Sequence, residues 1–357
     1  MRIERIALRD FRSYDGAELA LGPGLTIVYG ANGAGKTNLL EALYFGCTAR
    51  SFRTTNDRNL ARFGSGATRV VLSGSDDDGP HELAVGFVPG ELKRMTSDGA
   101  VVERLAAVAH RPLVSVFSPD RLELIKGQPG LRRAHLDQFV AGLWPSRAST
   151  RRAYHEALAQ RNALLSRVRS GRSPSDALTP WNLTLAEAGV VLSADRAAAA
   201  GRIEEAFAAH AAALGLSGDA SVSYRARSAA QSAAQLAGEI AERLDTDLSR
   251  GYTTHGPHRD ELVFARDGRE LRAFGSQGEQ RLALLALLLA ERDALAAERD
   301  RPPLMLLDDV MSELDVVRRE RLAGALRRGG GQSVVTATEL EHVPGWDADD
   351  VVRIEVP

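Results

Sequence analysis

Apolar positions in the first third of the chain form short runs bounded by turn residues, and a helical pattern follows one of these runs. Residues 25–29 are apolar and β-branched, which predicts a buried strand, while residues 38–48 carry helical spacing. Turn residues separate the neighbouring segments at 22–24, 75–80 and 98–99. Residues 1–119 are therefore expected to begin an α/β lobe.

Residues 120–249 follow a different pattern, rich in Ala, Leu, Arg and Glu with apolar residues at helical spacing. One helix is expected around 154–168 and another around 236–248. Breaks at 173–175 and 215–218 interrupt this pattern, and no heptad repeat is sustained. The segment is therefore expected to be an all-helical insert that forms a compact lobe without a long coiled coil.

Strand patterns return from about residue 250. Residues 261–266 and 269–274 flank Asp267-Gly268, a pair typical of a type I′ hairpin. The remaining pattern predicts a helix over 276–299, then a strand at 304–307 and a last strand at 333–336. Residues 250–357 are therefore expected to complete the α/β lobe that residues 1–119 begin.

The composition is that of an ordinary globular protein of 357 residues, with 44% hydrophobic and 26% charged residues. The single cysteine, Cys47, excludes disulfides within the chain and favours a reducing cytosol. The N-terminal residues alternate charged and apolar side chains, unlike a signal peptide, and no uncharged apolar run reaches membrane-spanning length. We therefore expect a cytoplasmic protein that does not bind membranes.

Residues 30–37 fit the phosphate-binding pattern G-x-x-x-x-G-K-[ST] and lie between an expected strand and an expected helix. Glycines in such a loop let backbone N–H groups curl around a phosphate at a helix N-terminus. Lys36 would place its charge on the outer phosphates, and the Thr37 hydroxyl would ligate Mg²⁺. The chain is therefore expected to bind a nucleoside triphosphate with Mg²⁺. The expected nucleotide contacts in this segment are Gly30, Ala31, Asn32, Gly33, Ala34, Gly35, Lys36, Thr37 and Asn38.

The expected strand at 304–307 ends in Asp308 and Asp309. An aspartate at position 308 would hold the Mg²⁺ that Thr37 also reaches. Asp309 would orient or deprotonate the water that attacks the γ-phosphate. Two acids after a strand are equally typical of a solvated strand end, and only their combination with the phosphate-binding loop favours the catalytic interpretation.

The helix expected from residue 276 begins with Ser276-Gln277-Gly278-Glu279, which fits a capping box. Residues 274–280 resemble the signature motif of ABC-type ATPases, in the variant of the SMC and Rad50 group. The resemblance implies that Ser276, Gly278 and Glu279 contact the nucleotide of a second chain, in a head-to-tail dimer that encloses two ATP molecules. It also implies that residues 312–315 are the D-loop, which lies across such an interface.

A closer resemblance extends over essentially the whole chain. Six segments carry it, namely residues 8–14, 117–120, 127–129, 132–137, 256–260 and 307–315. In content and order they are similar to the RecF family of bacterial recombination mediators. The resemblance implies an ABC-type ATPase head with an inserted lobe, and it adds Arg12 and Asp315 to the nucleotide contacts.

The same resemblance implies a function. It implies ATP-dependent binding to DNA without sequence specificity, slow DNA-stimulated hydrolysis of ATP, and ATP-dependent dimerisation on double-stranded DNA beside single-stranded gaps. It also implies that the chain engages RecR, and indirectly RecO and RecA, to promote RecA loading in gap repair and the SOS response.

Three positions depart from transporter-type ABC ATPases. Ser118 stands about where those enzymes have the Q-loop glutamine, and residues 336–338 stand where they have the switch histidine. Asp309 is one methylene shorter than their usual glutamate. All three departures favour a slow timer over a fast motor.

Binding to DNA requires local basic patches, because the net charge is −2. The strongest local imbalance lies in residues 147–172, with seven arginines and one acid, Glu156. Arginine suits phosphate contacts, although a solvated helix face explains the same residues equally well. The candidate DNA contacts are Arg147, Arg151, Arg152 and Arg169, or alternatively Arg50, Arg53 and Arg62 in the head.

Other functions fit parts of this pattern. The nearest alternative is a different SMC-like ATPase. Examples are a nuclease partner of the overcoming-lysogenization-defect type and a short Rad50-like head. A transporter subunit fits less well, because its helical subdomain is much smaller than the insert at 120–249. A binding module that never hydrolyses ATP is the remaining alternative, and a turnover assay would distinguish it.

Overall fold

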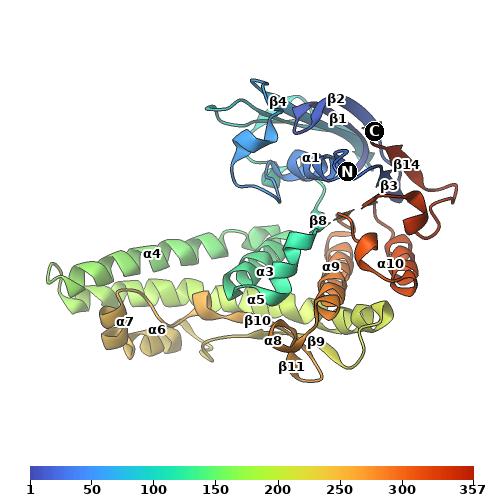
Figure 1. The fold of residues 1–357 in the computed structure, drawn as a ribbon. Coiled ribbons are helices and arrows are strands. Elements are labelled where there is room, and N and C mark those ends of the chain that lie inside the picture. Colours follow the sequence, from blue (N-terminus) through green and yellow to red (C-terminus); the bar gives the residue numbers. More distant parts are fainter. The chain divides into compact units, whose positions relative to one another are not determined.

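The computed structural model describes all 357 residues, which form two compact units. The first unit comprises residues 1–121 and 295–357, and the second comprises residues 122–294. Figure 1 labels their helices and strands.

The first unit contains a five-stranded parallel sheet in the order β14-β3-β13-β12-β8. Its strands are β3 (Leu25–Tyr29), β8 (Val114–Phe117), β12 (Leu304–Leu307), β13 (Ser333–Ala337) and β14 (Val352–Glu355). The central strands are nearly continuous apolar runs, as expected for strands buried on both faces. Because all five strands are parallel, their carboxyl ends meet at one edge.

A six-stranded antiparallel sheet in the order β2-β1-β4-β5-β6-β7 forms the rest of the scaffold. Its strands are β1 (Arg2–Phe11), β2 (Tyr14–Ala20), β4 (Thr68–Asp76), β5 (Gly79–Phe87), β6 (Arg94–Ser97) and β7 (Ala100–Val102). Apolar residues alternate with polar ones along β1 and β4, so that Ile6, Leu8 and Val70 enter the core. Helix α1 (Lys36–Thr48) packs on that inner face (Figure 1).

The remaining elements of the first unit are mostly short. They are α10 (Val316–Arg328), η1 (Asp57–Leu60), η2 (Leu105–Ala107), η7 (Met311–Glu313) and η8 (Leu340–His342). Two elements cross the boundary between the units, η3 (Pro119–Leu122) and α9 (Gln277–Arg299).

The second unit is mainly helical. Its helices are α2 (Glu123–Lys126), α3 (Pro129–Leu143), η4 (Pro145–Arg147), α4 (Thr150–Arg169), η5 (Ser175–Leu178), α5 (Thr179–Leu214), α6 (Ala233–Ala241), α7 (Leu244–Arg250), η6 (Pro257–Arg259) and α8 (Leu271–Phe274). Helices α4 and α5 run side by side, and Tyr154, Leu185 and Leu236 join them to α6 in one apolar cluster (Figure 1). None of the helices combines the length and the apolar character that crossing a bilayer requires.

The structure agrees with the expected ABC-type head fold and with the absence of a long coiled coil. The insert, however, is not all-helical. Residues Ala220–Arg225 form strand β9, which pairs with β10 (Glu261–Arg266) in a sheet completed by β11 (Arg269–Glu270). Buried Ala220 and Val222 alternate with exposed serines, a weak two-residue period. The partner strand is some forty residues away along the chain, so no local pattern shows the pairing.

The boundary expected at residues 249–250 also differs from the observed one. The second unit runs to residue 294 and therefore contains β10, β11 and most of α9. Pairing with β9 explains why β10 belongs with the helices.

Three smaller expectations are corrected. The Asp267-Gly268 turn is present, with φ values of 50° and 74°, but residues 271–274 form α8 and not a strand. The helix expected over 236–248 is split into α6 and α7 around Arg243. Ser333–Ala337 is not the last strand, because β14 adds to the sheet beside β3.

Candidate nucleotide-binding site

The loop between β3 and α1 has the backbone that a phosphate-binding loop needs. Gly30, Gly33 and Gly35 adopt φ values of 147°, 86° and 114°, a region that side chains disfavour. Lys36 begins α1 and is buried, and its Nζ donates hydrogen bonds to the carbonyl oxygens of Gly30 and Ala31 at 2.7 and 2.8 Å. The loop therefore encircles the lysine, and phosphate oxygens would replace those two acceptors.

The turn between β1 and β2 holds the far end of this loop. The Tyr14 hydroxyl donates to the carbonyl oxygen of Gly35 at 3.2 Å, and the Asn38 amide donates to Ser13 Oγ at 2.9 Å. Burial raises the pKa of Tyr14 to about 12, so the hydroxyl keeps its proton at neutral pH. Ala31, Asn32 and Gly33 remain exposed, while Ala34 donates its backbone N–H to Ala31 O at 3.2 Å.

Asp308 lies where the sequence predicted, at the carboxyl end of β12. Thr37 Oγ1 donates to its carboxylate, 2.9 and 3.0 Å from the two oxygens, and Thr336 Oγ1 donates to Oδ1 at 3.0 Å. The Asp308 backbone N–H donates to Phe117 O at 2.9 Å, which places Ser118 beside the site at the end of β8. Desolvation raises the pKa of Asp308 and Asp309 adds to the rise, while the hydrogen bonds from Thr37 and Thr336 oppose it. No cation forms an ion pair with this carboxylate.

This donor set fits Mg²⁺. A buried carboxylate without a cationic partner is costly, and a divalent ion would neutralise it. Carboxylate and hydroxyl oxygens are the hard ligands that Mg²⁺ prefers, and Asp308 and Thr37 supply one of each within hydrogen-bond distance of each other.

Asp309 differs from its neighbour in conformation and in contacts. Its φ of 50° is left-handed, its backbone N–H donates to Thr336 Oγ1 at 2.7 Å, and Ser312 Oγ donates to its carbonyl oxygen at 2.8 Å. Its carboxylate has no hydrogen-bond or ion-pair partner and is partly exposed. The arrangement therefore fixes the backbone and leaves the acid free to accept a proton.

Sequence reasoning missed Glu41, which lies on α1 and is fully buried. Arg12 donates to both of its carboxylate oxygens, at 2.8 and 2.6 Å, and Arg53 Nη1 donates to one at 3.1 Å. Arg53 also donates to Asn38 Oδ1 at 2.9 Å. The signal was a single acid within an apolar stretch of helix, which usually marks a buried ion pair.

The start of α9 is the second part of the expected site, and it belongs to the second unit. The capping box is formed, with Ser276 N–H donating to Glu279 Oε2 at 2.8 Å and Glu279 N–H donating to Ser276 Oγ at 3.3 Å. The hydrogen bond from Ser276 N–H, with an ion pair to Arg266, lowers the pKa of Glu279. Ser276, Gln277 and Gly278 are exposed, so the first amides of α9 face solvent.

The expected D-loop lies directly after Asp309. Asp315 caps α10, because its Oδ1 accepts from Arg318 N–H at 2.9 Å and its other oxygen pairs with the Arg318 guanidinium at 3.2 Å. Val316 and Val317 follow as exposed apolar residues.

Three of the seven arginines at 147–172 pair with acids from elsewhere in the second unit. Arg147 and Arg151 pair with Asp195 and Asp137 at 3.0 and 3.3 Å. Arg161 is fully buried and pairs with Asp247 at 2.7 Å, so it is neither available to DNA nor part of a solvated helix face. Counting only the acid within residues 147–172 therefore overestimated the positive charge of this surface, because acids from other segments lie beside it.

Four further candidates for DNA contact differ in how they are paired. Arg152 pairs with Glu156 at 3.2 Å on an exposed helix face, and Arg62 lies 3.9 Å from Asp10. Arg50 and Arg169 are exposed and have no ion-pair partner.

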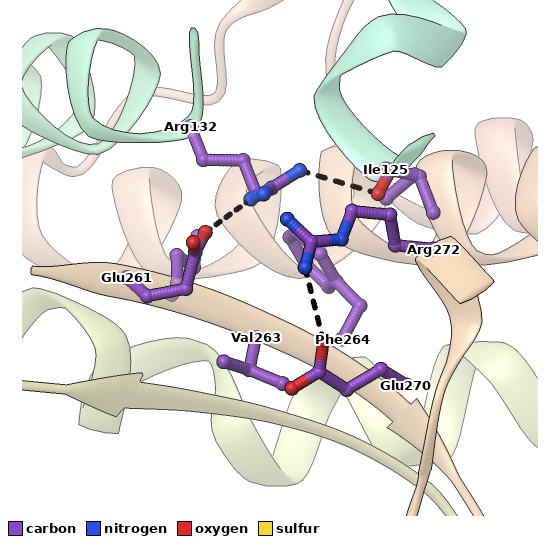
Figure 2. Close-up of a pocket in the computed structure, with 8 residues that line it drawn as sticks. Ile125, Arg132, Glu261, Val263, Phe264, Glu270 and Arg272 are labelled. Carbon is purple, nitrogen blue, oxygen red and sulfur yellow. Dashed lines mark hydrogen bonds and ion pairs between the residues drawn. The ribbon is translucent and has the colours of Figure 1, made fainter. Parts of the chain in front are cut away.

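Figure 2 shows a small hollow in the second unit, which lies between α2, α3 and β10. Arg132 occupies it, donating to Glu261 Oε1 at 2.6 Å and to the carbonyl oxygen of Gly127 at 2.9 Å. Arg272 and Glu270 form another ion pair there, at 3.7 Å. Because its charges are paired with one another, the hollow is a structural feature and not a nucleotide site.

Residues 5–84 match the model of the AAA domain family. DNA replication and repair protein RecF of Anaeromyxobacter sp. (strain Fw109-5) is 38% identical to the chain, with 97% of this chain and 96% of the relative covered. RecF of Myxococcus xanthus (strain DK1622) is 36% identical, with 100% and 96% covered.

Solved structures give the same result. A structure of the recombination mediator protein RecF with ATP superposes with a TM-score of 0.84 at 27% identity, covering 95% of this chain and 92% of that one. The Smc head domain of Pyrococcus furiosus superposes with a TM-score of 0.58 at 18% identity, covering 97% and 91%, and it shares the fold alone.

Proposed function

The chain belongs to the RecF family of DNA replication and repair proteins within the SMC- and Rad50-like ABC ATPases, and from that premise we propose that it is an ATP-dependent recombination mediator. It dimerises on ATP at double-stranded DNA next to single-stranded gaps. It hydrolyses ATP to ADP and phosphate slowly and with stimulation by DNA. With RecR and RecO it promotes RecA loading in gap repair and the SOS response.

The observation that carries this proposal is the buried Asp308 carboxylate, held by Thr37 and Thr336 at the edge of the parallel sheet. Lys36 and the backbone amides of residues 30–37 bind the phosphates, and Thr37 and Asp308 hold Mg²⁺. Mg²⁺ held there would supply positive charge that stabilises the charge developing on the transferred phosphate.

Asp309 is proposed to accept a proton from the attacking water, because its carboxylate is free and its backbone is fixed by Thr336. Its side chain is short, and Ser118 and residues 336–338 stand about where faster ABC ATPases have the Q-loop glutamine and the switch histidine. Slow turnover follows, so hydrolysis limits how long the dimer stays on DNA.

Dimerisation is proposed to depend on α9. Its exposed amides and Ser276 offer hydrogen bonds and a positive helix dipole to an anion. By the family resemblance that anion is the γ-phosphate bound to a second chain, so each nucleotide is enclosed by two chains. Val316 and Val317, exposed beside the D-loop, would be covered in the same dimer.

The experiment that tests this function compares nucleotides. The protein is mixed with a gapped DNA duplex and with ATP, ADP or a non-hydrolysable ATP analogue, and its size and mobility shift are measured. We expect a DNA-bound dimer with ATP and with the analogue, longer lived with the analogue, and none with ADP. Equal binding with ADP would contradict an ATP-dependent mediator.

A further inference from the structure

The outer face of the six-stranded sheet carries a row of residues that the strand register brings side by side. Arg9 on β1 pairs with Arg69 on β4, Arg69 pairs with Gly86 on β5, and Gly86 pairs with Arg94 on β6. Their sequence neighbours Leu8, Val70 and Val85 are buried against α1, so the row points to the opposite face. The residues come from distant parts of the chain, and only the register shows them together.

The three arginines of this row lack the neutralisation found elsewhere. Arg9, Arg69 and Arg94 are exposed, and none of them forms an ion pair. Glu18, the acid on the same face of β2, is engaged by Arg5 at 2.5 Å. Like charges directly opposite each other across two strands destabilise a sheet, so the fold itself gains nothing from Arg9 facing Arg69.

The row has a length and a shape that suit a strand of nucleic acid. Adjacent strands of a sheet are about 4.8 Å apart, so Arg9 to Arg94 spans roughly 14 Å. Gly86 has no side chain, and a Cβ placed there would meet nothing closer than 3.9 Å. The middle of the row is therefore open between arginines on either side.

Two loops at the same end of the sheet expose apolar side chains. Phe63 lies in the loop that leads into β4 and is 103% exposed, and Leu92 lies in the turn between β5 and β6 and is 96% exposed. The first loop is anchored, because Arg62 N–H donates to Asp10 O at 2.8 Å and Ala61 bridges to Phe11. Phe63 is thus presented on a fixed base, beside an arginine and two glycines, Gly64 and Gly66.

We propose that this surface, formed by Arg9, Arg69, Arg94 and Phe63, binds a DNA strand, with the arginines on phosphates and Phe63 stacked on an unpaired base. The assignment rests on the proposed function, which requires DNA binding but does not say where. It replaces helix α4 as the DNA-contacting surface, because three of the five arginines of α4, Arg151, Arg152 and Arg161, are paired with acids.

The surface is also connected to the nucleotide site. Arg9 faces Gly16 in the β1–β2 hairpin, and the turn of that hairpin places Ser13 and Tyr14 against the phosphate-binding loop. DNA held on the outer face of this hairpin therefore contacts the element that also supports the phosphate-binding loop.

The test measures DNA affinity with ATP present against salt concentration, for single-stranded, gapped and blunt duplex DNA. The variants are Arg9→Gln/Arg69→Gln/Arg94→Gln, Phe63→Ala, and the control Arg5→Gln, which lies on the same face of β1 but is paired with Glu18. The triple variant should weaken all sequences alike and flatten the salt dependence by about 2 to 3 units of slope. Phe63→Ala should weaken single-stranded and gapped DNA about 5- to 100-fold with an unchanged slope, and leave blunt duplex nearly unaffected. The control should resemble the wild type.

Protein stability and dimerisation separate a binding role from a structural one. Removing the like-charge pair by Arg69→Gln should leave the melting temperature equal or higher, and ATP-driven dimerisation should persist in every variant. If the wild type binds DNA but the triple variant keeps its affinity and salt slope, the proposed surface is wrong while the proposed function stands. If Phe63→Ala weakens blunt duplex as much as single strands, base stacking is wrong. If the wild type binds no DNA with ATP, the proposed function itself fails.

Discussion

The phosphate-binding loop and the start of α9 share one structural feature but differ in the groups that surround it. Both present backbone amides at a helix N-terminus. In the loop the surrounding groups already converge, because Lys36, Thr37 and Asp308 are held by hydrogen bonds within the first unit. At α9 the capping box orders Ser276 and Glu279, but the exposed amides have nothing from their own unit to bind.

In the proposed dimer the loop is one half of a composite nucleotide site and the start of α9 is the complementary half. A helix end that is well ordered yet unfilled is suited to a ligand brought by another molecule. Four substitutions test whether the two regions separate in this way, from the largest expected effect to the smallest.

Lys36→Met should have the largest effect, because ATP binding, dimerisation and turnover are all lost together. It removes the charge on the triphosphate and the donor that holds Gly30 and Ala31, so ATP affinity should fall by about a hundredfold or more. Dimerisation should fail with it. Calorimetric titration with ATP and sizing with and without ATP measure both, and Lys126→Met, at an exposed lysine paired with Glu123, serves as the control. Normal ATP-dependent dimers of the Lys36 variant would show that dimerisation does not depend on the phosphate-binding loop.

Asp309→Asn should separate binding from turnover. Asparagine tolerates the left-handed backbone but accepts no proton, so hydrolysis should fall about 10²- to 10⁴-fold while ATP binding persists. The dimer should then remain longer on DNA, as measured by dissociation after dilution. Asp300→Asn, at an exposed aspartate with a φ of 52°, is the matched control. An unchanged residence time despite slower hydrolysis would refute the timer role.

Ser276→Arg should affect only what two chains do together. The bulky cation stands at the exposed end of α9, so ATP binding by the monomer should change less than about threefold while dimerisation falls at least tenfold. Titrations at low protein concentration and sizing at high concentration distinguish the two. Ser249→Arg, also exposed in the second unit, should have neither effect. Weaker ATP binding by the monomer would place Ser276 in its own chain's site.

Thr336→Val should have the smallest effect. Its hydroxyl donates to Asp308 and accepts from the Asp309 backbone, so its loss leaves that N–H unpaired and the two acids less well fixed. We expect turnover to fall about tenfold with little change in ATP affinity. Thr184→Val, in α5 of the second unit, whose hydroxyl donates to Pro180 O at 3.1 Å, should be near wild type. Equal effects of the two substitutions would remove Thr336 from the site.

What the sequence predicted depended on how local each signal was. The phosphate-binding loop, the strand ending in Asp308 and the capping box at Ser276 are each defined by a few consecutive residues. Helix α1 and the Asp267-Gly268 turn were predicted for the same reason. The backbone conformation of each of these features is determined by residues that are neighbours in the sequence.

Features that depend on distant partners were not predictable in the same way. Arg161 meets Asp247 across 86 positions, so a count of charges within one segment misjudged it. Strand β9 was missed because its partner β10 lies far along the chain, and the buried Glu41 joins Arg12 and Arg53 through tertiary packing. The row of Arg9, Arg69 and Arg94 exists only once the strand register is known.

The central claim is that each ATP is enclosed by the loop of one chain and the α9 start of another, and mixing two inactive variants tests it most directly. Lys36→Met and Ser276→Arg are combined in equal amounts, and ATP turnover is measured alongside the fraction of mixed dimers. Each mixed dimer keeps one intact composite site, so we expect up to about a quarter of wild-type turnover if chains pair at random. Mixed dimers that form and yet hydrolyse no faster than the separate variants would contradict the claim.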